Sequence, residues 1–342
     1  MNVLYSLIAV MVLVLVGVVA GRGDGGRAFI AVAIPYTALA VFLVGFCYRV
    51  LRWAWTPVPF RIPTTCGQQK SLPWIKANTI DNPSSGWGVV ARMGLEVLAF
   101  RSLFRNNQAR VDDKNRLVFG ENKFLWLGAI AFHWALLIVI LRHLRLLVEP
   151  IPAFVLMLQH VDGFFQITAP DLYASDVILL VALAYLLFRR LQDPLVRYIS
   201  FFTDYFALFL LLGVAISGML MRYVVRADIT TVKQFALSLA AFHPVVPATL
   251  GATFLVHLLL VSTLAAYFPF SKLVHMGGVF LSPTRNLANN NRRVRHINPW
   301  NYPVKTHSYA EWEEEFRDKI KAAGIPLDTS LEADHAGKAS AD

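Results

Sequence analysis

Four histidines lie in segments that otherwise read as apolar helix. His133 and His143 bound the stretch HWALLIVILRH, and His257 and His275 follow later in the chain. Ionisable side chains are costly inside a bilayer, so each is a functional hypothesis by default. The other five histidines fall in predicted connections or in the tail and are interpreted as solvated or structural: His160, His243, His296, His307 and His335.

The spacing of these four histidines makes two pairs if their helices run antiparallel. His133 and His143 are ten residues apart, or about 15 Å along a helix. His257 and His275 are eighteen residues apart, or up to about 27 Å. Pro269 lies between them and should kink or end that helix, which shortens the longer separation. His133 would then face His275, and His143 would face His257.

Two facing neutral imidazoles in an apolar slot are what a six-coordinate haem needs. The sequence therefore predicts two haem b groups stacked across one bilayer, with the four histidines as ligands of the haem iron. The alternative is that they are buried histidines bonded to the backbone. Four cations near the expected membrane faces are candidate partners for the haem propionates, and they could equally extend to lipid headgroups: Arg142, Arg145, Arg222 and Lys272.

The elements that must position these residues are strongly apolar. The 342-residue chain is 56% hydrophobic and only 16% charged, which favours a membrane protein over a soluble fold. Six stretches reach the roughly 20 residues that a membrane crossing needs. They are 2–20, 28–51, 124–148, 172–191, 201–221 and 245–268. We therefore predict an all-α integral membrane protein with six transmembrane helices, in which residues 124–280 form a four-helix haem-binding core.

The distribution of Lys and Arg orients the chain. The loop from Arg52 to Lys123 holds eleven of them and the tail from Ser271 holds ten, whereas Glu149–Asp171 holds none. The positive-inside rule then makes the loop and both termini cytoplasmic. The net charge of +10 is explained by topology and partner docking, and nucleic acid need not be invoked. Five cations on the outer side oppose this assignment: Arg22, Arg27, Arg222, Arg226 and Lys233.

Three further regions flank the core. Residues 1–51 form the first two transmembrane helices, residues 52–123 a cytoplasmic loop with an amphipathic helix, and residues 281–342 a cytoplasmic tail. The tail should hold one short helix at about 309–323, followed by disorder. Within the core, residues 151–168 favour a re-entrant or interfacial helix over a seventh crossing, because they are short and broken by polar residues.

The amphipathic helix of the loop carries one apolar stripe. Basic residues lie between the stripe positions, which suits a helix in the membrane interface or against a partner subunit. A stripe that covers this protein's own helix ends fits equally well. The stripe consists of Val90, Met93, Val97, Phe100 and Phe104.

Several competing interpretations remain open at this stage. Residues 2–20 could be a cleaved signal peptide, but the missing Lys or Arg before Tyr5 and the missing cleavage site favour a retained helix. Cys47 and Cys66 are too few for a disulfide framework or an iron–sulfur cluster. A proton channel or transporter with a histidine relay is the second functional hypothesis. A haem-free membrane anchor is the third, and it leaves the four histidines without partners.

The paired spacing resembles the respiratory nitrate reductase gamma-subunit family of dihaem membrane cytochromes b. In that family, one helix carries two haem ligands ten residues apart, and a later antiparallel helix carries two ligands eighteen residues apart. The four histidines match these positions over about residues 28–280. The extra first helix, PVPFRIPTTCGQQKSLPWIK and RMGLEVLAFRSLFRN resemble the DsrM subgroup, the membrane cytochromes of DsrMKJOP complexes of sulfur metabolism. The long loop 52–123 departs from the nitrate reductase type and implies a different soluble partner.

The resemblance implies electron transfer between a quinone or menaquinone pool and a cytoplasmic iron–sulfur subunit. That subunit would be DsrK-like, similar to heterodisulfide reductase, and the chain would lie in the inner membrane of a prokaryote. Other DsrMKJOP subunits, including a periplasmic multihaem cytochrome c, would be further partners. The haem near His133 and His275 would be proximal to the iron–sulfur subunit, and the haem near His143 and His257 would be distal, with quinol reacting beside it. Four residues near the outer face could accept the released proton: Glu149, His160, Asp171 and Asp176.

Overall fold

The computed structural model describes residues 1–56, 77–163, 171–282, 285–290 and 306–327. The segment PVPFRIPTTCGQQKSLPWIK, the second cysteine and the last residues of the tail lie outside these ranges, so the expectations placed on them are not tested. The chain forms two compact units, Met1–Pro57 with Arg61–Arg295 and Val58–Phe60 with His296–Asp342. The larger unit holds all four histidines that the sequence singles out.

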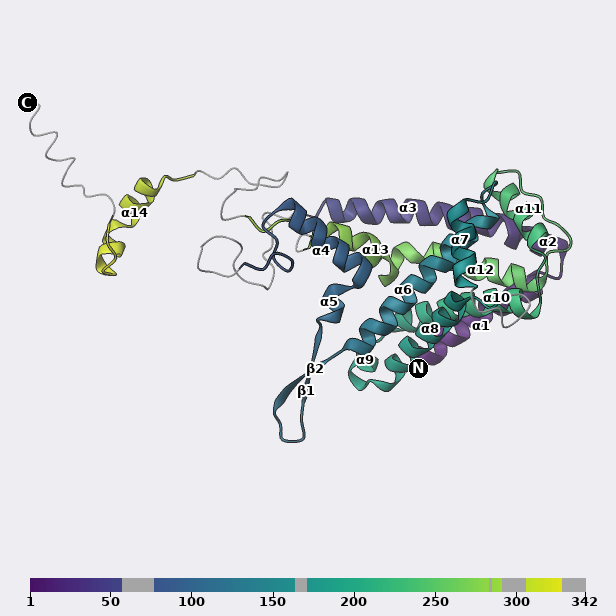
Figure 1. Ribbon diagram of the computed structural model, residues 1–342, viewed down its shortest axis with the longest axis horizontal. Helices are drawn as coiled ribbons and strands as arrows, with labels where there is room; N and C mark the ends of the chain where they lie inside the picture. The colour runs from purple at the N-terminus through teal and green to yellow at the C-terminus, as the bar shows by residue number, and fades with distance from the viewer. Residues whose placement is uncertain (57–76, 164–170, 283–284, 291–305, 328–342) are drawn as a thin grey trace, which may run out of the picture. The chain divides into compact units, whose positions relative to one another are not determined.

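A bundle of long apolar helices makes up most of the larger unit (Figure 1). Two of these helices are extended by one π-helical turn, α3 by η1 and α10 by η3. The bundle helices are α1 (Asn2–Ala20), α2 (Asp24–Ala28), η1 (Phe29–Ala33), α3 (Ile34–Ala54), α6 (Lys123–His143), α8 (Ala174–Gln192), α10 (Phe202–Met219), η3 (Leu220–Val224) and α12 (Ala252–Tyr267).

Shorter elements connect these helices. They are α4 (Gly86–Ala99), α5 (Arg101–Phe104), the antiparallel hairpin β1 (Asn107–Val111) and β2 (Leu117–Glu121), η2 (Leu144–Leu146), α7 (Ala153–Asp162), α9 (Pro194–Tyr198), α11 (Ile229–Ala240), η4 (Phe268–Phe270), η5 (Lys272–Val274), α13 (His275–Gly278) and η6 (Val279–Leu281). In the smaller unit, α14 (Tyr309–Ala322) begins with a capping box between Ser308 and Glu311.

Five segments are long and apolar enough to cross a membrane. They are Asn2–Ala20, Asp24–Ala54, Lys123–Leu146, Phe202–Val224 and Ala252–Phe270. The sequence predicted six, and the sixth stretch does form a helix, α8. It is not among the five, since Asp176, Arg189 and Arg190 lie near its two ends. The prediction of six crossings is therefore only partly confirmed, although α8 packs along both α6 and α10.

The helices approach one another closely where one of them carries glycine. A Cβ at Gly128 of α6 would lie 2.6 Å from the ring of Tyr185 on α8, and one at Gly45 of α3 would lie 2.9 Å from Pro269. In a bilayer, the lipid is as apolar as the helix surfaces, so close backbone approach contributes much of the attraction between helices. The glycines thus fix which faces of α3, α6 and α8 meet their neighbours.

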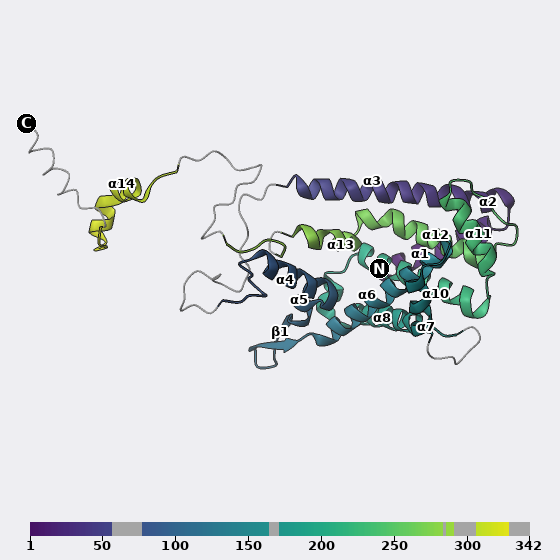
Figure 2. The same ribbon diagram turned by 45° about the horizontal axis from the view of Figure 1, so that its top comes forward.

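The two ends of the bundle carry different elements (Figures 1 and 2). We call one the hairpin end, because α4, α5 and the hairpin lie there, and the other the α11 end, because α11 lies there with α2 and α7. Asn2 bonds Ser200 O, which places the start of α1 at the hairpin end. Tyr36 donates to Leu239 O at the α11 end, 2.8 Å away. The hairpin end is the one that the Lys and Arg distribution predicts to be cytoplasmic.

The connections differ in detail from the sequence prediction. The loop before α6 contains a two-stranded hairpin, which an all-α prediction did not include. The predicted apolar stripe spans two helices rather than one, since Phe100 has a left-handed φ of 51° and separates α4 from α5. The short helix within 151–168 and the tail helix near 309–323 are confirmed as α7 and α14.

Candidate functional site: paired histidines in the helix bundle

His133 and His275 face each other at the hairpin end. Their ring centroids are 5.9 Å apart, with an angle of 84° between the ring planes. His133 lies in the middle of α6, whereas His275 begins α13, after α12 has ended at Tyr267 and the chain has passed Pro269 in η4. The predicted interruption at Pro269 is confirmed. It allows the later histidine to turn back toward α6.

His143 and His257, the second predicted pair, lie toward the α11 end. His143 is the last residue of α6, and His257 lies within α12. A Cβ at Gly218 of α10 would lie 3.3 Å from His257 Cε1. The lack of a side chain at Gly218 therefore leaves room beside this ring.

Each of the four rings directs one nitrogen to a hydrogen-bond partner. His133 Nδ1 lies 2.7 Å from Ala129 O, and His143 Nδ1 lies 2.7 Å from Val139 O. His275 Nδ1 lies 2.9 Å from Lys272 O. A carbonyl oxygen only accepts, so Nδ1 carries the proton in these three rings and Nε2 keeps its lone pair.

His257 reaches the same tautomer through a serine. Ser217 Oγ donates to Val214 O at 3.1 Å, so it has no second proton for His257 Nδ1, which is 2.9 Å away. With the serine proton directed to that carbonyl, the imidazole is the donor to the hydroxyl. An N–H held in this way fixes the orientation of a metal-binding histidine and leaves Nε2 for the metal.

Aromatic rings surround the pair at the hairpin end. Phe100 packs edge-on against His133 with centroids 4.9 Å apart, and Phe132 does the same at 4.8 Å. Trp126 Nε1 donates to Ala99 O at 2.8 Å, and Trp134 Nε1 donates to Leu98 O at 3.1 Å. These two carbonyls belong to the last turn of α4. Carbonyls in the last turn of a helix have no N–H partner within that helix. Two indoles of α6 thus dock the end of α4 beside His133.

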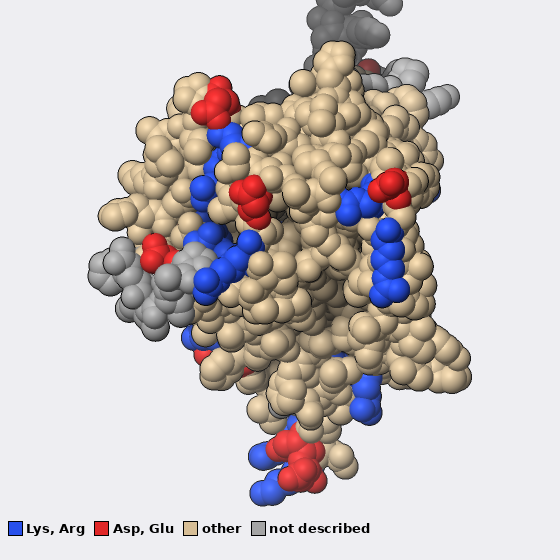
Figure 3. Space-filling model, turned by 90° about the vertical axis from the view of Figure 1, so that its right-hand side faces the viewer, with Lys and Arg blue, Asp and Glu red and all other residues tan. Residues whose placement is uncertain are grey.

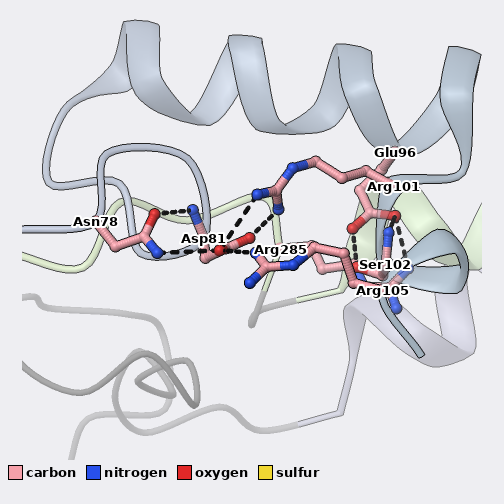
Figure 4. Close-up of polar contacts among 7 residues, drawn as sticks. All are labelled: Asn78, Asp81, Glu96, Arg101, Ser102, Arg105 and Arg285. Atoms are coloured by element: carbon pink, nitrogen blue, oxygen red, sulfur yellow. Dashed lines mark hydrogen bonds and ion pairs between the residues drawn. The ribbon is translucent and has the colours of Figure 1, made fainter. Parts of the chain in front are cut away.

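A cluster of charged residues holds the segment before α6 in place (Figure 4). Asp81 pairs with both Arg101 and Arg105, and it is also bonded by the Asn78 side chain at 3.0 Å. The buried Glu96 accepts from Ser102 N and Oγ, and Arg285 lies 4.0 Å from its carboxylate. These contacts tie α4 and α5 to the start of the tail, as the figure shows. They explain how a loop segment can hold Phe100 against His133.

Arg142, next to His143, is buried in an ion-pair network. Its Nε lies 2.9 Å from Asp162 Oδ2, and one terminal nitrogen contacts Asp176 and donates to Ser175 Oγ at 2.9 Å. Ser175 in turn donates to Asp162 from its backbone nitrogen and its hydroxyl. The residue is only 7% exposed. A propionate partner and a lipid-facing cation were the two expectations for Arg142, and the structure places it instead against two carboxylates.

The other three cations differ in accessibility. Lys272 Nζ pairs with Asp204 Oδ1 at 2.8 Å, yet its side chain stays 76% exposed close to His275. Arg222 donates to Asp171 O at 3.1 Å, and its guanidinium lies 3.9 Å from the ring centre of Tyr173. Arg145 makes no ion pair within the described ranges. Lys272 and Arg145 therefore remain available to a propionate, one at each end.

The four predicted proton acceptors lie in different environments at the α11 end. Glu149 pairs with Lys233 of α11, and Asp171 contributes its backbone carbonyl. His160 makes no hydrogen bond to another described residue. Asp176 alone is joined to both a buried arginine and a tyrosine hydroxyl, Tyr223 Oη, at 2.9 Å. Figure 3 looks onto this end, where basic and acidic side chains stand side by side in a mostly uncharged surface.

A small apolar groove opens beside this network. Its volume is about 230 Å³, and its walls come from α8, α10 and η3. The residues that line it are Leu180, Ile216, Met219, Leu220, Tyr223 and Val224. Tyr223 therefore belongs both to the groove and to the network around Arg142.

Sequence reasoning missed most of the residues that surround Arg142. Asp162, Ser175 and Tyr173 were not singled out, and Ser217 was overlooked as a partner of His257. A buried arginine needs carboxylate partners, and Asp162 and Asp176 are the acidic residues that begin or end helices near that level. This signal could have found them. The role of Ser217 depends on how α10 packs against α12, which the sequence does not contain.

Comparison with known proteins identifies the family of this chain. The profile of the nitrate reductase gamma subunit family matches residues 87–296, which hold all four histidines. A protein of Archaeoglobus fulgidus described as a Hdr-like menaquinol oxidoreductase cytochrome b-like subunit is 45% identical over 79% of this chain and 82% of its own length. Its counterpart in Archaeoglobus profundus is 43% identical over 80% of this chain and 82% of its own length. This chain is a mostly helical, multi-pass membrane protein, and it belongs to the nitrate reductase gamma subunit family.

Proposed function

We propose that this chain is a dihaem membrane cytochrome b that carries electrons between menaquinol and a cytoplasmic iron–sulfur subunit resembling heterodisulfide reductase. The observation that carries the proposal is the facing pair of His133 and His275, whose ring centroids are 5.9 Å apart, with His143 and His257 as the second proposed ligand pair. The names of the two relatives, which contain the terms menaquinol oxidoreductase, cytochrome b-like and Hdr-like, support the same activity and a multi-subunit complex.

The residues present fit two haem b groups. Within the part of the chain that the structure describes, no three His, Cys, Asp or Glu side chains converge as a metal site. Haem iron needs only two axial ligands from the protein, because the macrocycle supplies the others. The four Nδ1 bonds would orient the rings and raise the basicity of Nε2. When bound, the haems would supply one-electron transfer between the two ends of the bundle.

The side chains around each pair would serve different tasks. Phe100 and Phe132 would shield the haem at His133 and His275 from water, and the exposed Lys272 would hold a propionate there. Arg145 would do so at the α11 end, whereas Arg142 would act on the haem only through its fixed position beside His143. Arg222 is committed to Tyr173 and Asp171 O and would take part indirectly.

The orientation follows from the charge of the connections. The hairpin end carries the loop rich in Lys and Arg, and would face the cytoplasm and the iron–sulfur subunit. We propose the DsrK-like subunit and the other DsrMKJOP subunits, with a periplasmic multihaem cytochrome c, as the partners, and dissimilatory sulfur metabolism as the setting. The inner membrane of a prokaryote is the location, with six crossings that include α8.

A difference spectrum of the purified full-length chain tests the function. We expect a reduced-minus-oxidised b-type signal with two haems per chain. His143→Ala should remove the haem shared with His257 and leave the other, and His133→Ala should do the reverse. His160→Ala is the matched control and should keep both haems. A wild-type protein that binds no haem would refute the proposal and favour a channel or a haem-free anchor.

A further inference from the structure

We propose that the groove between α8 and α10 binds the aromatic head of the quinol, and that Tyr223 and Asp176 take up its proton. This inference rests on the proposed function and assigns the residues of its quinol site. Four observations carry it: the position of the groove, the bonds at its polar end, the groups that face Asp176 and the contacts behind α10.

The groove is apolar and accessible from the bilayer. Ile216 is 45% exposed, Leu220 41% and Val224 70%. Positions 216, 219, 220 and 223 repeat at steps of three and four, so they share one face of α10 and η3. Leu180 lies one turn below Asp176 on α8 and closes the other side. An apolar slot of this kind, open to lipid and ending in a few polar groups, suits a lipid-soluble ring with one hydroxyl at its edge.

The polar end of the groove can accept one proton. Tyr223 Oη donates to Asp176 Oδ2 at 2.9 Å and accepts from Tyr173 N at 3.0 Å. Arg222 also hydrogen-bonds the Tyr223 side chain, so a quinol hydroxyl that bonds the phenol oxygen would take the place of that contact. The turn that carries Tyr223 is the π-helical turn η3, a local irregularity that recurs at functional sites.

Asp176 is set between a cation and this phenol. Arg142 from α6 contacts one carboxylate oxygen, and Tyr223 from η3 bonds the other. Asp162 of α7 reaches it only through Arg142 and Ser175. The Asp176 side chain is 13% exposed, so a proton that it accepts can continue to solvent at the α11 end.

The far side of α10 contacts the second histidine pair. Ser217 bonds His257, and Gly218 lies against the same ring, whereas their neighbours Ile216 and Met219 line the groove. The groove and the distal haem ligand are thus separated by one helix, which is about 10 Å thick. Electrons and protons from one quinol would therefore leave in different directions.

The oxidation of the quinol is balanced in electrons and protons if the haems accept the electrons. Oxidation of a quinol to the quinone releases two electrons and two protons. The proposed b haems, in their ferric state, would accept these two electrons one at a time. As one quinol O–H bond breaks, its proton goes to Tyr223 Oη while the Tyr223 proton moves to Asp176, so the tyrosine ends neutral. The second proton follows after Asp176 has released the first.

Kinetics of haem reduction in the complete complex test the assignment. Membranes that contain the complex are mixed with menadiol, a soluble naphthoquinol, and the b-type absorbance is followed. We expect Tyr223→Phe and Asp176→Asn to slow this reduction about 100-fold, while the haem reducible by dithionite stays at the wild-type level. Leu180→Phe should fill the groove and raise the KM for menadiol more than it lowers kcat. Asp176→Glu, which keeps a carboxylate, should restore part of the rate.

Two variants at the same end serve as controls. Asp228→Asn removes another carboxylate at this end and Tyr36→Phe another phenol hydroxyl, and in both variants the haems should be reduced at the wild-type rate. Wild-type menadiol kinetics in both Tyr223→Phe and Leu180→Phe would overturn the inference and leave a lipid chain as the occupant of the groove. Tyr223→Phe loses a single hydroxyl, so it tests the site even if Asp176→Asn does not fold. If the complex contained no haem that dithionite can reduce, the proposed function itself would be refuted.

Discussion

The two histidine pairs have different close neighbours. At the hairpin end, His133 is enclosed by the rings of Phe100 and Phe132, and both indole hydrogen bonds and the ion pairs of Asp81 hold α4 and α5 beside it. At the α11 end, the residue next to His143 is a buried arginine between two carboxylates. The difference fits a division of labour, in which one end exchanges only electrons and the other also handles protons.

The largest expected effect comes from breaking the network at the α11 end. Arg142→Met would leave Asp162 and Asp176 buried without their cation, and should lower the free energy of unfolding by about 3–5 kcal/mol. Thermal unfolding of the detergent-solubilised protein, followed by circular dichroism, measures this. Arg145→Met removes a neighbouring cation with no ion pair in the described ranges, and should change little. An equal loss in both variants would show that the network does not stabilise this end.

A smaller effect is expected when the neutral contacts of the hairpin end are removed. Trp126→Phe and Trp134→Phe each delete one indole N–H that bonds the last turn of α4, at a cost of about 1 kcal/mol each. Hydrogen exchange should become faster in the amides of α4 and α5 and stay unchanged in α8 and α10. Trp55→Phe is the control, because that residue is 70% exposed at the end of α3. Unchanged exchange in α4 would contradict the docking role of the two indoles.

The smallest effect concerns two surface carboxylates, the half-buried Asp112 at the hairpin end and the exposed Asp228 at the α11 end. A hydrogen bond from the Arg116 backbone holds the pKa of Asp112 in the hairpin below its usual 3.8, and bonds from Thr231 and Thr230 do the same for the pKa of Asp228 at the start of α11. A carboxyl whose pKa is lower in the folded state stabilises the fold above about pH 4, and this stabilisation is lost as the pH falls through the folded pKa.

Hydrogen exchange of the backbone amides, measured at decreasing pH, therefore distinguishes these two end segments from the middle of the bundle. The hairpin and the first turn of α11 should open more readily below about pH 4, whereas the middle of α6 should not respond. Asp112→Asn should abolish the response only in the hairpin, and Asp228→Asn only in α11. A response that survives both substitutions would mean that other carboxyls control these two segments.

The sequence predicted the elements better than the contacts between them. Apolar length located the bundle helices, because it depends on single helices. The spacing of the histidines predicted that His133 and His275 would face each other, as their rings do. The hairpin was missed because its strands are short and exposed, with Asn115 at a left-handed φ of 57° in the turn. The break at Phe100 was missed because the apolar stripe continues through it. The partners of Arg142 come from two other helices, α7 and α8, so no local pattern reveals them.

Phe100, the left-handed residue at the end of α4, lowers the stability of the loop but provides a ring contact to His133. A positive φ costs a bulky residue such as Phe100 roughly 1 kcal/mol, a cost that glycine would avoid. Glycine at this position would also remove the ring that lies 4.9 Å from the ring of His133. Selection for a more stable loop and selection for the aromatic contact thus favour different residues at position 100. In a library of substitutions there, glycine should rank highest by thermal stability, whereas the aromatic residues should keep the wild-type haem spectrum best.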